Sequence, residues 1–170
     1  MKASTTQPKT SLACAVLTVS DTRTAENDTS GDYLQDGLAA EGHQCVARAI
    51  SAGNLYQIRK IISDWIANDS IQVILVNGGT GFSHQKATGA AITPLLDTTI
   101  TGFGELFRHL SYLDIGTSTL QSDAFAGAAN DTLIFCMPGS TSACRTAWES
   151  IIREQLDSTH RPCNFASHYA

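Results

Sequence analysis

Four apolar, strand-like runs alternate with helix-like stretches in this chain, and this alternation limits the fold more than any other feature of the sequence. The runs cover residues 13–19, 44–50, 72–76 and 132–137. A helix between two strands returns the chain to the same end of the sheet, so successive strands pair in parallel. The sequence therefore predicts an α/β fold, a three-layer α/β/α sandwich whose mainly parallel central sheet is covered by helices on both faces.

Apolar residues at helical spacing place the helices between these runs. One helix is expected over residues 31–41, and a second begins near Asn54, with Leu55, Ile58 and Ile62 on its buried side. A last long helix should follow the fourth run.

The region between residues 85 and 121 breaks the simple alternation. It contains two further helical stretches, around residues 90–96 and 103–113, with a short run at 98–101 between them. This region is expected to form the outer part of a ligand site.

The 170 residues fit one domain, because a chain of this size buries roughly 70% of its unfolded surface. We expect a polar leader at residues 1–10, the domain at 11–158, and a tail at 159–170 that has no helix pattern. The tail is expected to extend over the surface or over a neighbouring subunit.

Charge and cysteine content exclude several classes of function. The net charge of −5 argues against nucleic-acid and anionic-membrane binding, which need a basic face. An odd number of cysteines, five, without a C-x-x-C pair argues against a disulfide framework and a structural zinc site. With no apolar run of membrane length, a cytoplasmic location is expected. The histidines lack metal-ligand spacing and are expected at the surface or at an interface: His43, His84, His109, His160 and His168.

A glycine cluster follows the third apolar run directly. The chain reads Asn77-Gly78-Gly79-Thr80-Gly81 at the carboxyl end of a predicted central strand, where open parallel sheets bind their ligands. Glycines let backbone N–H groups converge on an anion, although a plain tight turn would have the same composition. The cluster is neither a P-loop, because no glycine precedes Lys86, nor a dinucleotide fingerprint, because the third glycine is missing.

Two more polar segments should reach the same edge of the sheet. Pro138-Gly139-Ser140-Thr141 follows the fourth run, and Ser20-Asp21 with Ser30-Gly31 brackets the loop after the first. Residue type alone favours helix caps as the role of their serines and threonines.

These motifs, in this order, resemble the molybdopterin-binding MoaB/Mog family and come closest to its MoaB branch. Members carry Gly-Gly-Thr-Gly, as at residues 78–81, and then Gly-Phe-Gly-Glu-x-x-Arg, as at residues 102–108. The resemblance continues at residues 17–21, 28–31, 116–122 and 137–145. It covers most of the chain, from Ala13 to Asn164.

The resemblance implies that the ligand is molybdopterin or its precursor. It assigns contacts with the ligand or its phosphate to Ser20, Asp21, Ser30, Gly31, Gly78, Gly79, Thr80, Gly81, Glu105, Ser122, Pro138, Gly139, Ser140 and Thr141. It also implies a homo-oligomer, a trimer or a hexamer, and other molybdenum cofactor biosynthesis proteins as partners.

The departures from the family pattern concern catalysis. Its catalytic branch transfers an adenylyl group from ATP to molybdopterin and needs carboxylates to hold Mg²⁺. The two acidic positions fall here on Gly53 and Lys86, and neither side chain offers a metal-binding oxygen. We therefore expect molybdopterin binding with adenylyl transfer weak or absent. Two alternatives stay open: an active adenylyltransferase whose Mg²⁺ is held by Asp21, Asp28 or Glu105, and a pathway scaffold that binds no ligand.

Overall fold

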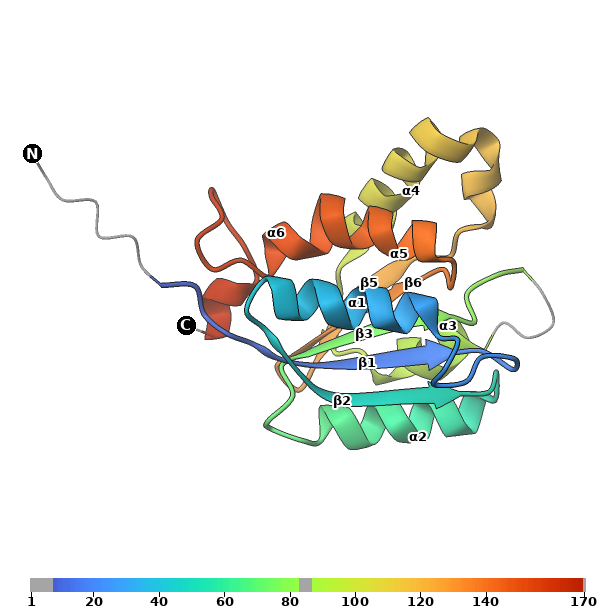
Figure 1. Cartoon of the computed structure of the whole chain (residues 1–170), viewed down its shortest axis with the longest axis horizontal. Coiled ribbons are helices and arrows are strands. Elements are labelled where there is room, and N and C mark those ends of the chain that lie inside the picture. Colours follow the sequence, from blue (N-terminus) through green and yellow to red (C-terminus); the bar gives the residue numbers. More distant parts are fainter. Residues whose placement is uncertain (1–7, 83–86, 170) are drawn as a thin grey trace, which may run out of the picture.

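The computed structural model describes residues 8–82 and 87–169, and a six-stranded sheet forms its centre (Figure 1). Its strands are β1 (Ala13–Val19), β2 (Gln44–Ser51), β3 (Val73–Gly78), β4 (Thr98–Thr99), β5 (Phe125–Ala129) and β6 (Thr132–Met137). They lie in the order β2-β1-β3-β6-β5-β4. The four apolar runs of the sequence form the parallel part, β2-β1-β3-β6, and β5 and β4 add an antiparallel edge.

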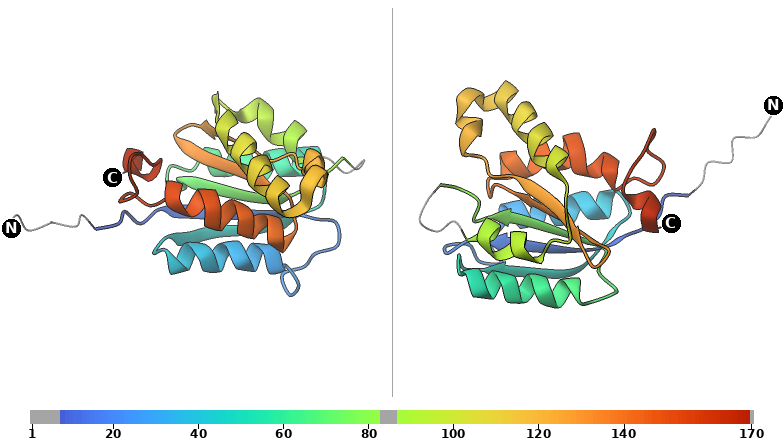
Figure 2. Two further views of the ribbon diagram at one scale, coloured as in Figure 1. Left: turned by 90° about the horizontal axis from the view of Figure 1, so that it is seen from above. Right: turned by 180° about the vertical axis from the view of Figure 1, so that it is seen from behind.

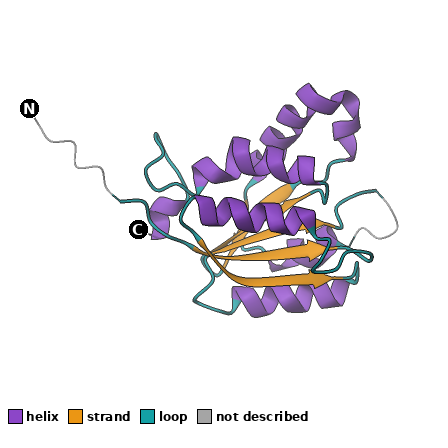
Figure 3. Cartoon of the chain, viewed as in Figure 1, coloured by secondary structure: helices purple, strands orange, loops and turns teal. Residues whose placement is uncertain are grey.

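Helices cover both faces of this sheet (Figure 3). The helices are α1 (Thr29–Ala40), α2 (Leu55–Ile66), α3 (Thr88–Ile92), α4 (Thr101–Ile115), α5 (Thr141–Ala147) and α6 (Arg153–Gln155). A π-helical turn, η3 (Trp148–Ile152), joins α5 to α6, so these three segments make up the long last helix expected from the sequence. Short 3₁₀ turns are η1 (Thr93–Leu95), η2 (Gly116–Gln121) and η4 (Ala166–Tyr169). No helix among the described residues is long and apolar enough to cross a membrane.

The alternation of side chains along β3 divides the core into two layers. Val73 and Leu75 pack with α1, α4 and α5 on one face, whereas Ile74 and Val76 pack with α2 and α3 on the other. All four are fully buried, and each contributes about 1.5–3 kcal/mol by leaving water. The predicted three-layer sandwich is therefore confirmed.

The antiparallel strand β5 was not expected from the sequence. Its residues, Phe125–Ala129, include no β-branched side chain, and small residues give little strand signal. The strand forms because Asn130 and Asp131 both adopt positive φ, 47° and 58°, which makes the two-residue turn that hairpins favour.

The carboxyl-terminal tail differs from the expected extended segment. Residues Ala166–Tyr169 form the 3₁₀ turn η4, and Ala166 is fully buried. The Phe165 ring packs against Phe135 with 6.5 Å between ring centroids. The tail turns back because Phe165 and Ala166 bury apolar surface against β6 of their own subunit.

The expectation that every histidine lies at a surface or interface is wrong for His43. Only 6% of this residue is exposed, and its Nδ1 accepts a hydrogen bond from the Leu12 N–H at 3.2 Å. The imidazole satisfies a backbone donor just ahead of β1, a role open only to the neutral ring. Burial lowers the pKa of His43 below its usual 6.5.

We predict that the protein loses stability as the pH falls below about 6.5. The unfolded chain protonates its histidine near that pH while folded His43 resists protonation, so the free energy of unfolding decreases by up to about 1.4 kcal/mol per pH unit. The substitution His43→Gln keeps an acceptor but does not titrate, and should flatten this slope in denaturant titrations at several pH values. His109→Gln, at an exposed position, is the control. Equal slopes for the wild type and His43→Gln would contradict the assignment.

Candidate functional site

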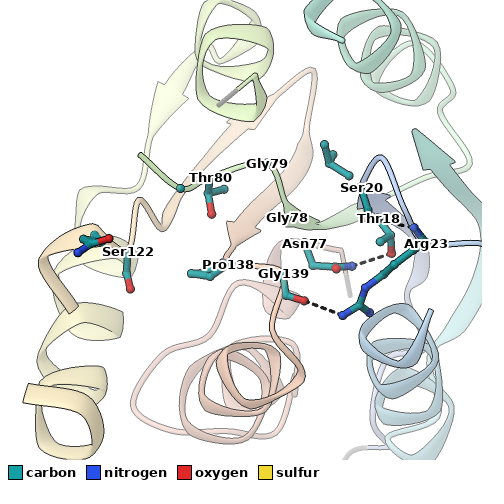
Figure 4. A pocket seen from close by; sticks show the side chains of 13 residues that line it. Thr18, Ser20, Arg23, Asn77, Gly78, Gly79, Thr80, Ser122, Pro138 and Gly139 are labelled. Carbon is teal, nitrogen blue, oxygen red and sulfur yellow. Dashed lines mark hydrogen bonds between the residues drawn. The ribbon is translucent and has the colours of Figure 1, made fainter. Parts of the chain in front are cut away.

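Three loops meet at the carboxyl ends of β1, β3 and β6 and enclose a cavity of about 350 Å³ (Figure 4). The chain leaves β1 toward β2 on one side and enters β3 on the other, so the cavity lies where the strand order reverses. Open α/β sheets bind their ligands at this position. Eight of the residues proposed from the sequence line the cavity: Ser20, Gly78, Gly79, Thr80, Gly81, Ser122, Pro138 and Gly139.

Backbone geometry explains the two glycines that open the loop after β3. Gly78 and Gly79 have φ angles of 93° and 64°, which L side chains rarely adopt. A Cβ atom on Gly78 would lie 2.2 Å from the Val19 carbonyl oxygen, and one on Gly79 would lie 2.3 Å from the Thr88 hydroxyl. The loop can therefore turn tightly against β1 only with glycine at both positions.

Arg23 lines the cavity and was not identified from the sequence. Its Nη1 donates to the Ser30 hydroxyl at 3.0 Å and to Asp28 at 3.4 Å, and its Nη2 donates to the Gly139 carbonyl at 3.3 Å. These bonds link the loop after β1 to the loop after β6. The available signal was that Arg23 is the one cation between Ser20 and Gly31.

A fully buried carboxylate, Asp28, holds Arg23 in this position. It accepts hydrogen bonds from Arg48 Nη2 at 2.9 Å, the Thr18 hydroxyl at 2.7 Å and the Gly31 N–H at 3.1 Å. Burial by itself would raise the pKa of Asp28, but the hydrogen bonds from Arg48, Thr18 and Gly31 outweigh it and hold that pKa below its usual value. Asp28 is therefore ionised and engaged with two arginines.

Asn77 and Thr18 are two further lining residues that sequence reasoning missed. Asn77 is fully buried, and its Nδ2 donates to the Thr18 hydroxyl at 2.9 Å and to the Leu17 carbonyl at 3.4 Å. Its Oδ1 is the one buried side-chain oxygen or nitrogen without a hydrogen-bond partner in the described part of the chain. A polar residue at the end of an apolar run was the signal that could have revealed it.

Two proposed ligand residues, Ser30 and Gly31, lie behind the cavity wall and do not line it. Ser30 is buried, and its hydroxyl donates to the Gly139 carbonyl at 2.9 Å. A Cβ atom on Gly31 would lie 2.0 Å from the Asp28 carboxylate, so this glycine permits close packing. Both residues position the cavity wall.

Three more proposed residues lie away from the cavity. Ser140 caps α5 by accepting a hydrogen bond from the Ala143 N–H at 3.2 Å. Thr141 shares a hydrogen bond of 3.2 Å with Ser30, and Glu105 is exposed on α4. The structure therefore gives Ser140 and Thr141 structural contacts and brings Glu105 to no part of the cavity.

A second hollow, of about 250 Å³, adjoins the first across Ser20, Gly79 and Gly81. Asp21 and Gly53 line it, and Asp21 Oδ1 accepts a hydrogen bond from the Gly53 N–H at 2.8 Å. No cluster of three His, Cys, Asp or Glu side chains suited to a metal ion occurs in residues 8–82 and 87–169. Lys86, the other departure from the family pattern, lies outside the described residues.

Fold and cavity together define an α/β protein whose glycine loops form a polar cavity suited to an anionic ligand. A family model described as "Probable molybdopterin binding domain" matches residues 15–158. The chain therefore belongs to the MoaB/Mog family of molybdenum cofactor biosynthesis proteins.

Individual relatives agree with this assignment. Molybdenum cofactor biosynthesis protein B of Escherichia coli (strain K12) is 56% identical over 154 residues, which cover 91% of this chain and 91% of that protein. A crystal structure of a molybdenum cofactor biosynthesis protein B superimposes with a TM-score of 0.85 at 38% identity, covering 88% of this chain and 94% of the other. The tungsten cofactor synthesizing protein MoaB from Pyrococcus furiosus gives a TM-score of 0.76 at 29% identity, with 85% and 92% covered.

Proposed function

We propose that this protein binds molybdopterin, or a precursor of it, in the cavity at the ends of β1, β3 and β6. The observation that carries the proposal is the cavity itself, in which two glycine-containing loops face the guanidinium of Arg23. Backbone N–H groups in a tight glycine turn and a fixed guanidinium together suit a phosphate group. Membership of the MoaB/Mog family supports molybdopterin as the phosphate-bearing ligand.

In this proposal each part of the cavity has a distinct task. Backbone N–H groups of the loop after β3 and the Thr80 hydroxyl, which points into the cavity in Figure 4, hold the anion. Arg23 neutralises its charge, and Ser122, at the end of η2, closes the opposite side. Asp28 keeps Arg23 in place without itself reaching the ligand.

Adenylyl transfer is weak or absent in this proposal, because the described residues do not fit Mg²⁺. Asp21 is one carboxylate beside the cavity, and Mg²⁺ needs several oxygen ligands in near-octahedral geometry. Asp28 is engaged by two arginines, and Glu105 is exposed on α4. The alternative of an active enzyme that uses these three acids therefore gains no support from the geometry. A scaffold without ligand would leave the polar cavity unexplained.

We predict that Thr80→Val weakens molybdopterin binding and that Ser140→Ala does not. Each substitution removes one hydroxyl, but only Thr80 lines the cavity, and a hydrogen bond to a charged partner contributes about 1.5–3 kcal/mol. Ser140→Ala should instead lower the free energy of unfolding by about 1 kcal/mol, because it removes a helix cap. Titration calorimetry and denaturant unfolding of both variants make the test. Unchanged affinity in Thr80→Val would remove Thr80 from the ligand site.

We predict that Lys86→Asp combined with Gly53→Asp raises Mg-ATP-dependent adenylation of molybdopterin above that of the native chain. The two aspartates would restore hard oxygen ligands, and one lost metal contact can slow turnover by roughly 10³-fold. The control Lys86→Ala removes the ammonium group that repels Mg²⁺ but adds no metal ligand. Activity that rises only with aspartate would show that a carboxylate oxygen is required. Adenylated product is measured with purified molybdopterin and Mg-ATP. Robust native turnover that Asp21→Asn abolishes would show that catalysis uses another carboxylate.

A homo-oligomer, a trimer or a hexamer, is the second part of the proposal. Large apolar side chains are exposed along α4 and η2: Leu106, Tyr112, Leu113, Ile115 and Leu120. Figure 2 shows this helical pair projecting from the sheet. Such a patch suits a second copy of the chain better than water. We expect sedimentation equilibrium at micromolar concentration to give a mass above that of one chain, and Leu113→Glu to reduce it. A monomeric wild type would exclude this proposal.

A further inference from the structure

The cavity is lined by a residue whose side-chain acceptor no group among the described residues satisfies. Asn77 Oδ1 is buried, lacks a hydrogen-bond partner among the described residues, and belongs to a residue that lines the cavity. Figure 4 shows Asn77 beside Gly78 and Gly139 at the cavity, and its side chain is fully buried there. Buried polar groups almost always have a partner, so an isolated exception at a ligand cavity indicates that the ligand supplies one.

The orientation of the Asn77 amide is determined by its neighbours. The Thr18 hydroxyl has one proton and donates it to the Asp28 carboxylate at 2.7 Å. Thr18 Oγ1 must therefore accept from Asn77, as its distance of 2.9 Å to Nδ2 indicates. Rotating the amide by 180° would bring two acceptor oxygens together. Because the Asp28 carboxylate can only accept, this orientation leaves Oδ1 as an acceptor without a partner among the described residues.

Arg23, in contrast, has N–H donors that lack acceptors in the described structure. A guanidinium has five N–H donors, and the hydrogen bonds of Arg23 to the described residues use Nη1 and one Nη2 contact, to Gly139. Within that part of the chain, the Nε–H and the second Nη2 proton have no partner and could donate to a ligand. The cavity thus offers hydrogen-bond donors to most oxygen atoms of an oxyanion, and a single acceptor, Asn77 Oδ1.

We propose that this cavity selects a protonated phosphate, either hydrogen phosphate or a phosphate monoester that keeps one P–OH group, over oxyanions that carry no proton. The P–OH group donates to Asn77 Oδ1, while the other oxygens accept from Arg23, Thr80 and the loop N–H groups. A fully deprotonated oxyanion of the same shape turns a lone pair toward Oδ1 and therefore binds more weakly. The inference rests on the proposed phosphate cavity and specifies which chemical form of the phosphate it takes.

Inorganic phosphate and sulfate provide the test. At mildly alkaline pH both are mainly dianions of similar size, but phosphate keeps a proton and sulfate has none. We expect the wild type to bind phosphate at least about tenfold more tightly, which corresponds to about 1.4 kcal/mol at 25 °C. Arsenate and selenate repeat the comparison with larger ions and should show the same preference. Titration calorimetry at constant ionic strength measures all four.

Two variants locate the origin of the preference. Asn77→Leu keeps the approximate size but removes the acceptor, and should bring the ratio of phosphate to sulfate affinity close to one. Thr80→Val removes a donor that serves either ion, so both affinities should fall by similar factors and the ratio should persist. In a crystal of the phosphate complex, one phosphate oxygen should lie about 2.5–3.0 Å from Asn77 Oδ1. Equal binding of phosphate and sulfate by the wild type, or a ratio unchanged in Asn77→Leu, would overturn the inference.

Failure of this inference is distinguishable from failure of the proposed function. Molybdopterin binding without oxyanion preference would leave the function standing and remove the role of Asn77. A preference for phosphate over sulfate without molybdopterin binding would support the role of Asn77 and contradict the proposed function. The wild-type ion comparison needs no substitution, so it remains decisive even if Asn77→Leu does not fold.

Discussion

The buried carboxylate of Asp28 is the interaction on which the geometry of the cavity depends. It connects Thr18 on β1, Arg48 on β2, the first turn of α1 and Arg23 in the loop between them. An ionised group inside a protein is tolerated only when charges and hydrogen bonds surround it, and Asp28 has both. The same contacts that solvate this carboxylate also set the positions of Arg23 and, through Thr18, of Asn77. Structural support and the proposed ligand recognition therefore belong to one polar network.

Arg23 gives the cavity a cation that is charged at every physiological pH. In the proposed function this guanidinium neutralises the phosphate without a metal ion. A fixed guanidinium favours binding of the ground state and contributes no ligand to a metal-assisted transfer. Binding a phosphate-bearing molecule and catalysing its reaction thus need different groups, and the described residues are suited to binding.

Particular residues show how much of the fold and of the candidate site could be predicted from the sequence. The glycines at 78, 79 and 81 were located because an apolar strand ending in glycines has a direct physical reading. The contacts of Ser30 with Gly139 and of Ser140 with the Ala143 N–H could not be foreseen, because a serine at a helix start has the same sequence signal whether it faces a ligand or caps the helix. Asn77, Thr18 and Arg23 were missed because their local signals are weak and their significance lies in contacts between segments distant in the sequence, Asn77 with Thr18 and Arg23 with Gly139. Strand β5 was missed for a similar reason, since pairing with β6 and a turn of positive φ define it, and its own composition does not.

The cavity walls come from segments separated by roughly sixty residues each, around positions 20, 78 and 139. The parallel pairings of β1 with β3 and of β3 with β6 bring these segments together. Such pairings close long chain loops, so the cavity cannot form in a partly folded chain. A ligand bound there recognises the native sheet and nothing less complete. Its occupancy therefore draws the whole folding equilibrium toward the native state, by RT ln(1 + [L]/Kd) for ligand at concentration [L]. Cellular supply of the ligand would in this way govern how much of the protein escapes unfolding and degradation.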